Sequence, residues 1–164
     1  MNKINNATIH IRHYQVSDAQ ILRQLFFNTV RLVNTKDYTQ AQVTAWAPSD
    51  YDEQVWAQHM QTLNPLVAEI DGKIVGYADL QSDGLIDHFF CHHQYQGCGV
   101  GKALMQSILE LAKQRNIHTL YSHVSKTAKP FFERLGFVVE KKQEVEVREQ
   151  VLTNFKMKKS VLDS

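Results

Sequence analysis

An eight-residue stretch with three glycines, Tyr95 to Lys102 (YQGCGVGK), constrains this chain more than any other feature. It lies between a strand-like run that ends at Cys91 and a run with helical periodicity that begins near Gly99. Because glycine has no Cβ, a ligand can approach the main-chain amides at Gly97, Gly99 and Gly101. The first turn of a helix adds unpaired N–H groups and the positive end of its dipole. The stretch therefore predicts a pyrophosphate-binding turn, with a tight turn that binds nothing as the alternative.

The spacing of the glycines argues against two common nucleotide-binding turns. A Walker-type loop has four residues between its glycines and a Ser or Thr after its lysine. Here three residues separate Gly97 from Gly101, and Ala103 follows Lys102. A dinucleotide-binding turn needs a third glycine where Lys102 stands and an acidic residue about twenty positions later, near Thr119, where none occurs. A nucleotide-binding domain is therefore the least favoured of the functions considered.

The pattern Q-x-x-G-x-G, from Gln96 to Gly101, resembles the pyrophosphate-binding motif of the GNAT superfamily of acyl-CoA-dependent N-acetyltransferases. Two longer segments support the resemblance: IDHFFCHHQYQGCGVGKALM is similar to the family's central strand, loop and helix, and AKPFFERLGF to its second signature segment. The resemblance implies an α+β fold, with a mixed, mostly antiparallel seven-stranded sheet flanked by helices. Its central parallel pair of strands would be splayed, and the expected order is β-α-α-α-β-β-β-α-β-α-β-β.

Helix caps, turns and alternation predict where these elements lie. Ser17, Thr39 and Asp50 are each followed three residues later by Gln or Glu, which is typical of a helix start. Asp71-Gly72 between apolar runs predicts a hairpin, and Gly136 a helix end. The expected strands are 8–12, 66–70, 73–80, 84–91, 119–124, 137–147 and 152–159, and the expected helices are 18–33, 39–46, 50–63, one from about 99 and one ending at 135.

Length and charge agree with a single domain. A chain of 164 residues can bury one core, so we expect one N-acetyltransferase domain over residues 1–164, with its core at about 7–159. Its 18 basic and 17 acidic residues give a net charge of +1, which argues against nucleic acid as a partner. Apolar runs are too short for a membrane span, and the first residues do not resemble a signal peptide, so we expect a cytoplasmic protein. We also expect a monomer or a homodimer.

The resemblance implies acetyl-CoA as co-substrate and suggests which residues bind it. Splayed strands leave backbone groups unpaired, so the pantetheine arm would lie along Phe89 to Cys91, with the Cys91 amide stabilising an oxyanion. Main-chain N–H groups of Gln96 to Lys102 would bind the pyrophosphate. The full predicted set is Phe89, Phe90, Cys91, Gln96, Gly97, Cys98, Gly99, Val100, Gly101, Lys102, Ser125, Lys126 and Phe132.

The implied reaction is direct attack of an amine on the thioester, which needs a group to accept the proton of the ammonium. His123 stands where many relatives carry a carboxylate, and Asp87 and His88 are alternatives on the preceding strand. The usual tyrosine that protonates the departing thiolate is replaced by Phe132. Tyr121 could take that role, or the thiolate could leave unprotonated or by way of water.

The acceptor would be a primary amine of a small molecule or a peptide. The resemblance places its pocket among the first helices and the last hairpin, with Tyr38 and Trp46, and also Tyr51 and Trp56, as candidate walls. No metal is expected, because the histidines near His88 lack a cysteine or carboxylate at ligand spacing. The missing tyrosine hydroxyl leaves a non-catalytic acyl-CoA-binding sensor or interaction module as the alternative function.

Overall fold

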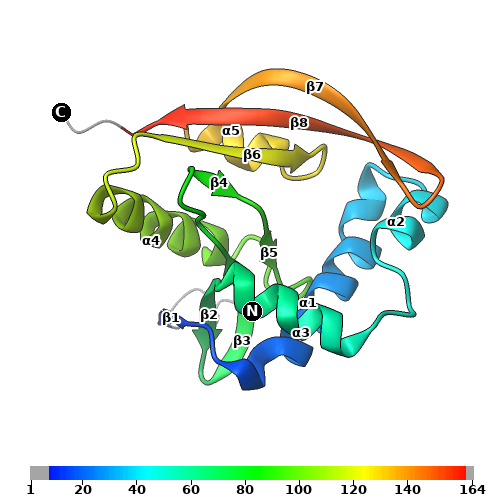
Figure 1. The fold of residues 1–164 in the computed structure, drawn as a ribbon, viewed down its shortest axis with the longest axis horizontal. Coiled ribbons are helices and arrows are strands. Elements are labelled where there is room, and N and C mark those ends of the chain that lie inside the picture. Colours follow the sequence, from blue (N-terminus) through cyan, green and yellow to red (C-terminus); the bar gives the residue numbers. More distant parts are fainter. Residues whose placement is uncertain (1–7, 162–164) are drawn as a thin grey trace.

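A computed structural model describes residues 8–161, whose strands form two four-stranded sheets (Figure 1). The first sheet has the order β1 (Ile9–His13), β2 (Leu66–Ile70), β3 (Lys73–Ala78), β5 (Phe89–Cys91). The second has the order β4 (Leu85–Ile86), β6 (Thr119–Ser125), β8 (Gln150–Ser160), β7 (Val138–Val147). The helices are α1 (Ala19–Leu32), α2 (Gln40–Trp46), α3 (Glu53–Leu63), α4 (Val100–Gln114) and α5 (Lys129–Arg134), with 3-10 turns at Val16–Asp18 and Asn34–Lys36. The predicted α+β class and element order are confirmed, while residues 1–7 and 162–164 of the predicted domain lie outside the described part.

The predicted strand 84–91 is divided into two, and this division separates the sheets. Ile86 of β4 pairs with β6 in parallel, whereas Phe90 of β5 pairs with β3 in the antiparallel sense. At the change of partner the buried carboxylate of Asp79 accepts the main-chain N–H groups of Asp87 (3.2 Å) and His88 (2.6 Å). The splayed parallel pair is thus confirmed, but the single continuous sheet is corrected. Buried polar backbone needs a partner, and Asp79 supplies it where the sheet cannot.

Local signals explain the helix starts, with two corrections. α2 begins with the predicted capping box, in which Thr39 Oγ1 accepts the Gln42 N–H (3.1 Å) and Gln42 Oε1 accepts the Thr39 N–H (2.8 Å). α3 is capped by Asp52, not by Asp50, because the Asp52 carboxylate accepts the first free N–H groups of the helix. The Ser17 box does not form, since a 3-10 turn precedes α1 and Asp18 accepts the Gln15 N–H instead.

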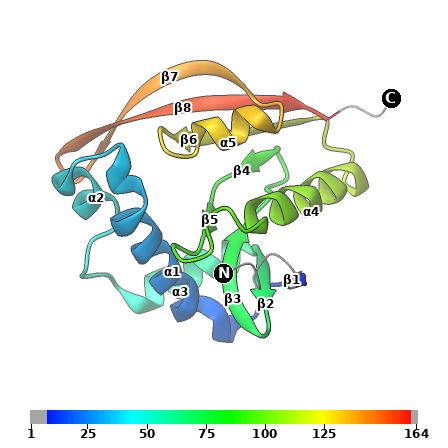
Figure 2. The same ribbon diagram turned by 180° about the vertical axis from the view of Figure 1, so that it is seen from behind.

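The helices pack on the sheets mainly through their apolar faces. α4 lies along the first sheet and α5 beside β6, as the view from behind shows (Figure 2). Gly76 of β3 permits this contact, because a Cβ there would lie 2.9 Å from the Val100 side chain. On α1 the apolar residues Ile21 and Leu32 do not join the core, since they are 52% and 59% exposed. No helix within residues 8–161 has the length and hydropathy that crossing a bilayer requires.

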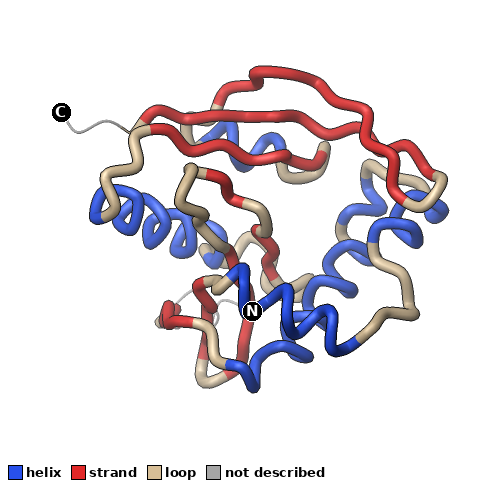
Figure 3. The backbone as a smooth tube through the Cα atoms, viewed as in Figure 1, coloured by secondary structure: helices blue, strands red, loops and turns tan. Residues whose placement is uncertain are grey.

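The last hairpin reaches from α5 to the first helices, as the backbone trace shows (Figure 3). At its far end Arg148 donates to the Ala45 carbonyl (2.7 Å), and the Val151 carbonyl accepts from the Gln42 side chain (2.9 Å). Tyr38 adds a third hydrogen bond by donating its hydroxyl proton to the Thr153 carbonyl (2.5 Å). These bonds close the space between the first helices and the second sheet.

Candidate active site

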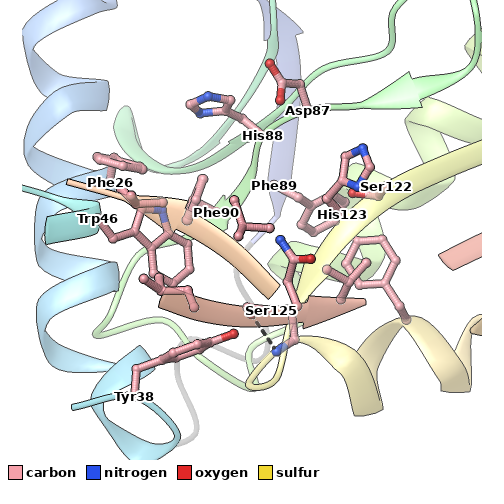
Figure 4. Close-up of a pocket in the computed structure, with 17 residues that line it drawn as sticks. Phe26, Tyr38, Trp46, Asp87, His88, Phe89, Phe90, Ser122, His123 and Ser125 are labelled. Atoms are coloured by element: carbon pink, nitrogen blue, oxygen red, sulfur yellow. Dashed lines mark hydrogen bonds between the residues drawn. The ribbon is translucent and has the colours of Figure 1, made fainter. Parts of the chain in front are cut away.

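Two adjoining cavities lie where the two sheets part. We call one the aromatic cavity; it has a volume of about 310 Å³ and is partly drawn in Figure 4. The other, of about 380 Å³, borders the glycine-rich turn and is called the glycine-loop cavity. Both are lined by the same five residues at their boundary: Phe89, Phe90, Ser125, Ala128 and Phe132. A ligand that lies in one cavity can therefore meet a ligand in the other at this shared wall.

The two cavities carry opposite charge. The side chains of Lys36, Lys102 and Arg134 line the glycine-loop cavity, and its lining residues include no Asp or Glu. The aromatic cavity has Asp87 as its single acidic lining residue and has no Lys or Arg. Aromatic rings form much of its remaining wall: Phe26, Tyr38, Trp46, Phe89, Phe90 and Phe132. The aromatic cavity therefore suits a cation with an apolar body, and the glycine-loop cavity suits an anion.

The glycine-rich turn leaves main-chain donors available at the start of α4. Gly97 (φ 73°) and Gly99 (φ 88°) adopt left-handed conformations, and Gly99 caps the helix. Within residues 8–161, no carbonyl accepts the N–H groups of residues 99–102. The Gln96 side chain folds back to donate to the Cys91 carbonyl (2.8 Å), which closes the loop. The geometry matches an anion site at a helix N-terminus, with the Gln96 amide serving the loop and not the ligand.

Strand β5 turns unpaired backbone groups toward the gap. The His92 N–H bonds to the Val75 carbonyl of β3 (2.8 Å), so the alternate N–H groups of Phe89 and Cys91 point away from β3. The Cys91 carbonyl on this same side accepts from Thr29 Oγ1 (2.9 Å). Burial raises the pKa of the Cys91 thiol to about 12, which makes the thiol unreactive. The main chain of Cys91, not its sulfur, is therefore the chemically useful part.

Polar side chains from the end of β6, from the loop before α5 and from the 3-10 turn Asn34–Lys36 lie near the shared wall. Ser125 Oγ accepts from the Ala128 N–H (3.1 Å) and from Asn34 Nδ2 (3.4 Å), so its own proton remains to be donated. Thr127 Oγ1 lines the glycine-loop cavity and is buried without a hydrogen-bond partner among the described residues. The sequence analysis did not select Asn34 or Thr127, because only the fold brings them beside the glycine-rich turn.

The three predicted proton acceptors, Asp87, His88 and His123, all line the aromatic cavity (Figure 4). His123 is exposed, and its Nδ1 lies 3.0 Å from Gln143 Nε2. The Asp87 carboxylate is exposed and forms no hydrogen bond or ion pair within residues 8–161. Of the three, His123 and Asp87 are therefore the more accessible to a ligand.

His88 is more enclosed than the other two. Its Nδ1 lies 3.0 Å from Tyr77 Oη, and its Nε2 lies 3.4 Å from His59 Nε2. Burial lowers the pKa of His88 to about 4, so its imidazole is neutral at pH 7 and accepts a proton poorly. The buried Asp79 holds the His88 main chain, and burial raises the pKa of Asp79 to about 6. Asp79 is a positioning residue that sequence reasoning missed. The sequence feature that could have revealed it is an acidic residue inside the apolar run of the predicted hairpin.

Some predicted residues lie away from the cavities. Tyr121 lines neither of them, and its hydroxyl donates to Asp83 (2.6 Å). Cys98 is also absent from both walls, and the Lys126 ammonium lies 5.3 Å above the Tyr38 ring. Trp46 and Tyr38 line the aromatic cavity as predicted, whereas Tyr51 and Trp56 line a separate hollow with Arg23.

Comparison with known proteins gives a consistent result. Residues 34–161 match the family model described as an acetyltransferase (GNAT) domain. The chain is 34% identical over 150 residues to the uncharacterised N-acetyltransferase YafP of Escherichia coli K12, covering 92% of this chain and 95% of that protein.

Solved structures show the same fold. A GCN5-related N-acetyltransferase from Rhodopseudomonas palustris superposes with a TM-score of 0.89 at 30% identity, covering 94% of this chain and 96% of that one. YncA of Salmonella typhimurium, a putative acetyltransferase solved with its cofactor acetyl-CoA, has a TM-score of 0.70 at 18% identity and 96% coverage of both chains.

Proposed function

Because this chain belongs to the GNAT family of acetyltransferases, we propose that it transfers the acetyl group of acetyl-CoA to a cationic primary amine of a small molecule or peptide, in a ternary complex. One observation carries the proposal: two cavities of opposite charge share a wall where the parallel strands part. The cavity with three basic side chains takes the phosphates of the co-substrate. The cavity with Asp87 and aromatic walls takes the amine.

The glycine-loop cavity has the donors that a CoA molecule requires. The N–H groups of residues 99–102 bind the pyrophosphate, and Lys36, Lys102 and Arg134 add positive charge around the phosphates. The backbone of β5 and the unpaired Thr127 hydroxyl meet the amides of the pantetheine arm. The thioester then lies at the shared wall, beside Phe132.

The aromatic cavity prepares the amine for attack. Asp87 attracts the ammonium, and the ring of Trp46 contacts its apolar body. His123 accepts the proton, since it is an exposed imidazole that lines this cavity. The amine nitrogen bonds to the thioester carbon, the carbon–sulfur bond breaks, and the electron pair leaves on sulfur as the CoA thiolate. The nitrogen releases its second proton to water as the amide forms. The Cys91 N–H stabilises the negative charge on the carbonyl oxygen during this step.

Ser125 takes over part of the role of the missing tyrosine. Phe132 is 2% exposed and offers no donor to the departing sulfur. Ser125 is the one shared lining residue with a side-chain hydroxyl. Because Ser125 Oγ already accepts two hydrogen bonds, its O–H donates to the thiolate, which takes its proton from water after leaving.

Thiol release tests this function. We expect acetyl-CoA-dependent release of free CoA with cationic primary amines that have an aromatic or apolar body, and weaker release with amines that also carry a carboxylate. Asp87→Asn should raise KM for the cationic amines, whereas Asp83→Asn, at an exposed acid outside both cavities, should not. Tight CoA binding without thiol release from any amine would instead support the acyl-CoA sensor.

A further inference from the structure

A cluster of three potential metal ligands lies at the edge of the aromatic cavity. One ligand atom each from His59, Asp87 and His88 lies within 4.8 Å of the other two. His59 comes from α3, and the other two residues come from the break between β4 and β5. In Figure 4, Asp87 and His88 lie together at one end of the cavity. The sequence pattern around His88 did not predict a metal site, because His59 lies 29 residues away in the chain.

The spacing of the two histidines fits a metal ion better than a direct hydrogen bond. Their Nε2 atoms are 3.4 Å apart, longer than the roughly 2.7–3.2 Å of a good hydrogen bond. Two nitrogens that are each about 2.0–2.1 Å from a tetrahedral Zn²⁺ lie roughly 3.3–3.4 Å from one another. The two imidazoles are thus already spaced as two corners of a tetrahedral site.

The surroundings of His88 supply the outer support that a metal ligand needs. Binding through Nε2 places the ring proton on Nδ1, and the Tyr77 hydroxyl lies 3.0 Å away to accept it. Asp79 holds the His88 main chain from behind through a 2.6 Å hydrogen bond. Arg23 and Arg148 line the neighbouring hollow, but their guanidinium groups are engaged elsewhere. Arg23 donates to the Pro48 carbonyl (2.6 Å), and Arg148 donates to the Ala45 carbonyl (2.7 Å).

We propose that His59, Asp87 and His88 bind a divalent transition-metal ion of the Zn²⁺ class, and that the bound ion closes the aromatic cavity to the acceptor amine. Two imidazoles and a carboxylate are a ligand set typical of Zn²⁺, and three protein ligands leave a fourth position for water. The metal neutralises the Asp87 carboxylate that would otherwise attract the ammonium, and its own positive charge repels the ammonium. The closure rests on the proposed function, whereas the binding of the ion does not.

Metal binding is measured first, without turnover. After removal of metal by a chelator, Zn²⁺ is titrated against a chromophoric competitor, and Co²⁺ is added as a spectroscopic probe. We expect one ion per chain and the visible absorption of tetrahedral Co²⁺. His59→Ala should weaken binding at least about 10-fold, and Tyr77→Phe by about 10- to 100-fold. His118→Ala is the matched control, because His118 is exposed and is not part of the cluster; it should bind as the wild type does. Equal affinity in wild type and His59→Ala, or no stoichiometric binding, would overturn the site.

Turnover then tests the closure. In the wild type, Zn²⁺ should raise KM for the amine and leave KM for acetyl-CoA unchanged. His59→Ala should match the wild type in metal-free turnover and lose the inhibition, since His59 lines neither cavity. Inhibition that persists in His59→Ala would overturn the closure. Absence of thiol release from the metal-free wild type would overturn the proposed function alone, because the metal titration does not depend on it.

Discussion

Single residues around the two cavities have proposed roles that their residue types alone do not reveal. We propose that Cys91 contributes its main-chain N–H, because desolvation raises the pKa of its thiol to about 12. Phe132 has no proton to donate, and Ser125 keeps a free proton because its oxygen already accepts two hydrogen bonds. His123 and His88 are both histidines of the aromatic cavity, but only His123 is exposed. At this scale, burial and hydrogen-bond partners decide function.

Replacing His123 by Ala should lower kcat by about 10²- to 10⁴-fold, because the ammonium then loses its positioned proton acceptor. The dissociation constant for CoA should not change, since His123 does not line the glycine-loop cavity. Steady-state kinetics and calorimetry measure the two quantities. His118→Ala is the control for a histidine outside the site, and undiminished turnover of His123→Ala would remove His123 from the mechanism.

The two cysteines should react differently with iodoacetamide. The pKa of Cys91 is raised to about 12, so at pH 8 nearly all of it is the unreactive thiol. Cys98, in the glycine-rich turn, is the internal control. Peptide mass mapping of the native protein should find Cys98 labelled and Cys91 unlabelled, and urea should make Cys91 reactive. Equal labelling of both in the native state would contradict the enclosed position of Cys91.

At the scale of elements, the site depends on how strands and helices end. The second sheet loses its strand after Ile86 because Asp79 binds the next two N–H groups. Gly99 adopts a left-handed conformation, so the residues before it are not part of the helix. The first N–H groups of α4 therefore have no preceding helical carbonyl to bond to and remain free within residues 8–161. The cavities lie between these two ends.

Asp79→Ala should reduce the free energy of unfolding by about 2–4 kcal/mol, because it leaves buried main-chain donors unpaired. It should also lower kcat, since Asp87 and His88 lose their support. Asp83→Ala is the matched control: Asp83 accepts two hydrogen bonds in an exposed position, whereas the buried Asp79 accepts three. Denaturant titration of both variants measures the difference. Equal losses of unfolding free energy would show that Asp79 stabilises the fold no more than an exposed aspartate does.

Gly101→Val should weaken CoA binding at least about 10-fold while the protein remains folded. A Cβ at this position would lie 2.9 Å from the Phe131 ring, so the added side chain displaces α5 or fills the glycine-loop cavity. Calorimetric titration with CoA measures the affinity, and circular dichroism checks the fold. Unchanged affinity would contradict the assignment of CoA to this cavity.

At the scale of the whole molecule, the two sheets share no hydrogen-bonded strand pair within residues 8–161. α4 packs on the first sheet, and α5 packs beside β6 of the second. We propose that residues 1–164 form one cooperative domain all the same, because one apolar cluster contains buried residues of both sheets, among them Val75, Leu120 and Met157. Calorimetry should show a single unfolding transition; two resolved transitions would show that the sheets unfold separately.

Acetyl-CoA should raise the melting temperature, since the cavity proposed to bind it lies between β5 of the first sheet and α5 beside the second. At a hundredfold excess over Kd the stabilisation is about 2.7 kcal/mol, or about 5–10 °C for a chain of this length. ATP and NAD are the controls and should leave the melting temperature unchanged. A larger shift with either nucleotide would favour the nucleotide-binding alternative.

The amino-acid sequence by itself determined the local features: the glycine-rich turn, the Thr39 cap, the Asp71-Gly72 hairpin and the family to which the chain belongs. These depend on conformational preferences and contacts within a few residues, which a sequence displays directly. It also placed most of the shared wall, because those residues flank the recognised motifs.

Only the tertiary structure decided which residues meet across the chain. His59 lies 29 residues from His88 in sequence and 3.4 Å from it in space, and no local pattern could have joined them. The same holds for Asp79 under the strand break and for Asn34 beside Ser125. Such contacts are set by how sheets and helices pack against one another, and packing depends on the whole chain at once.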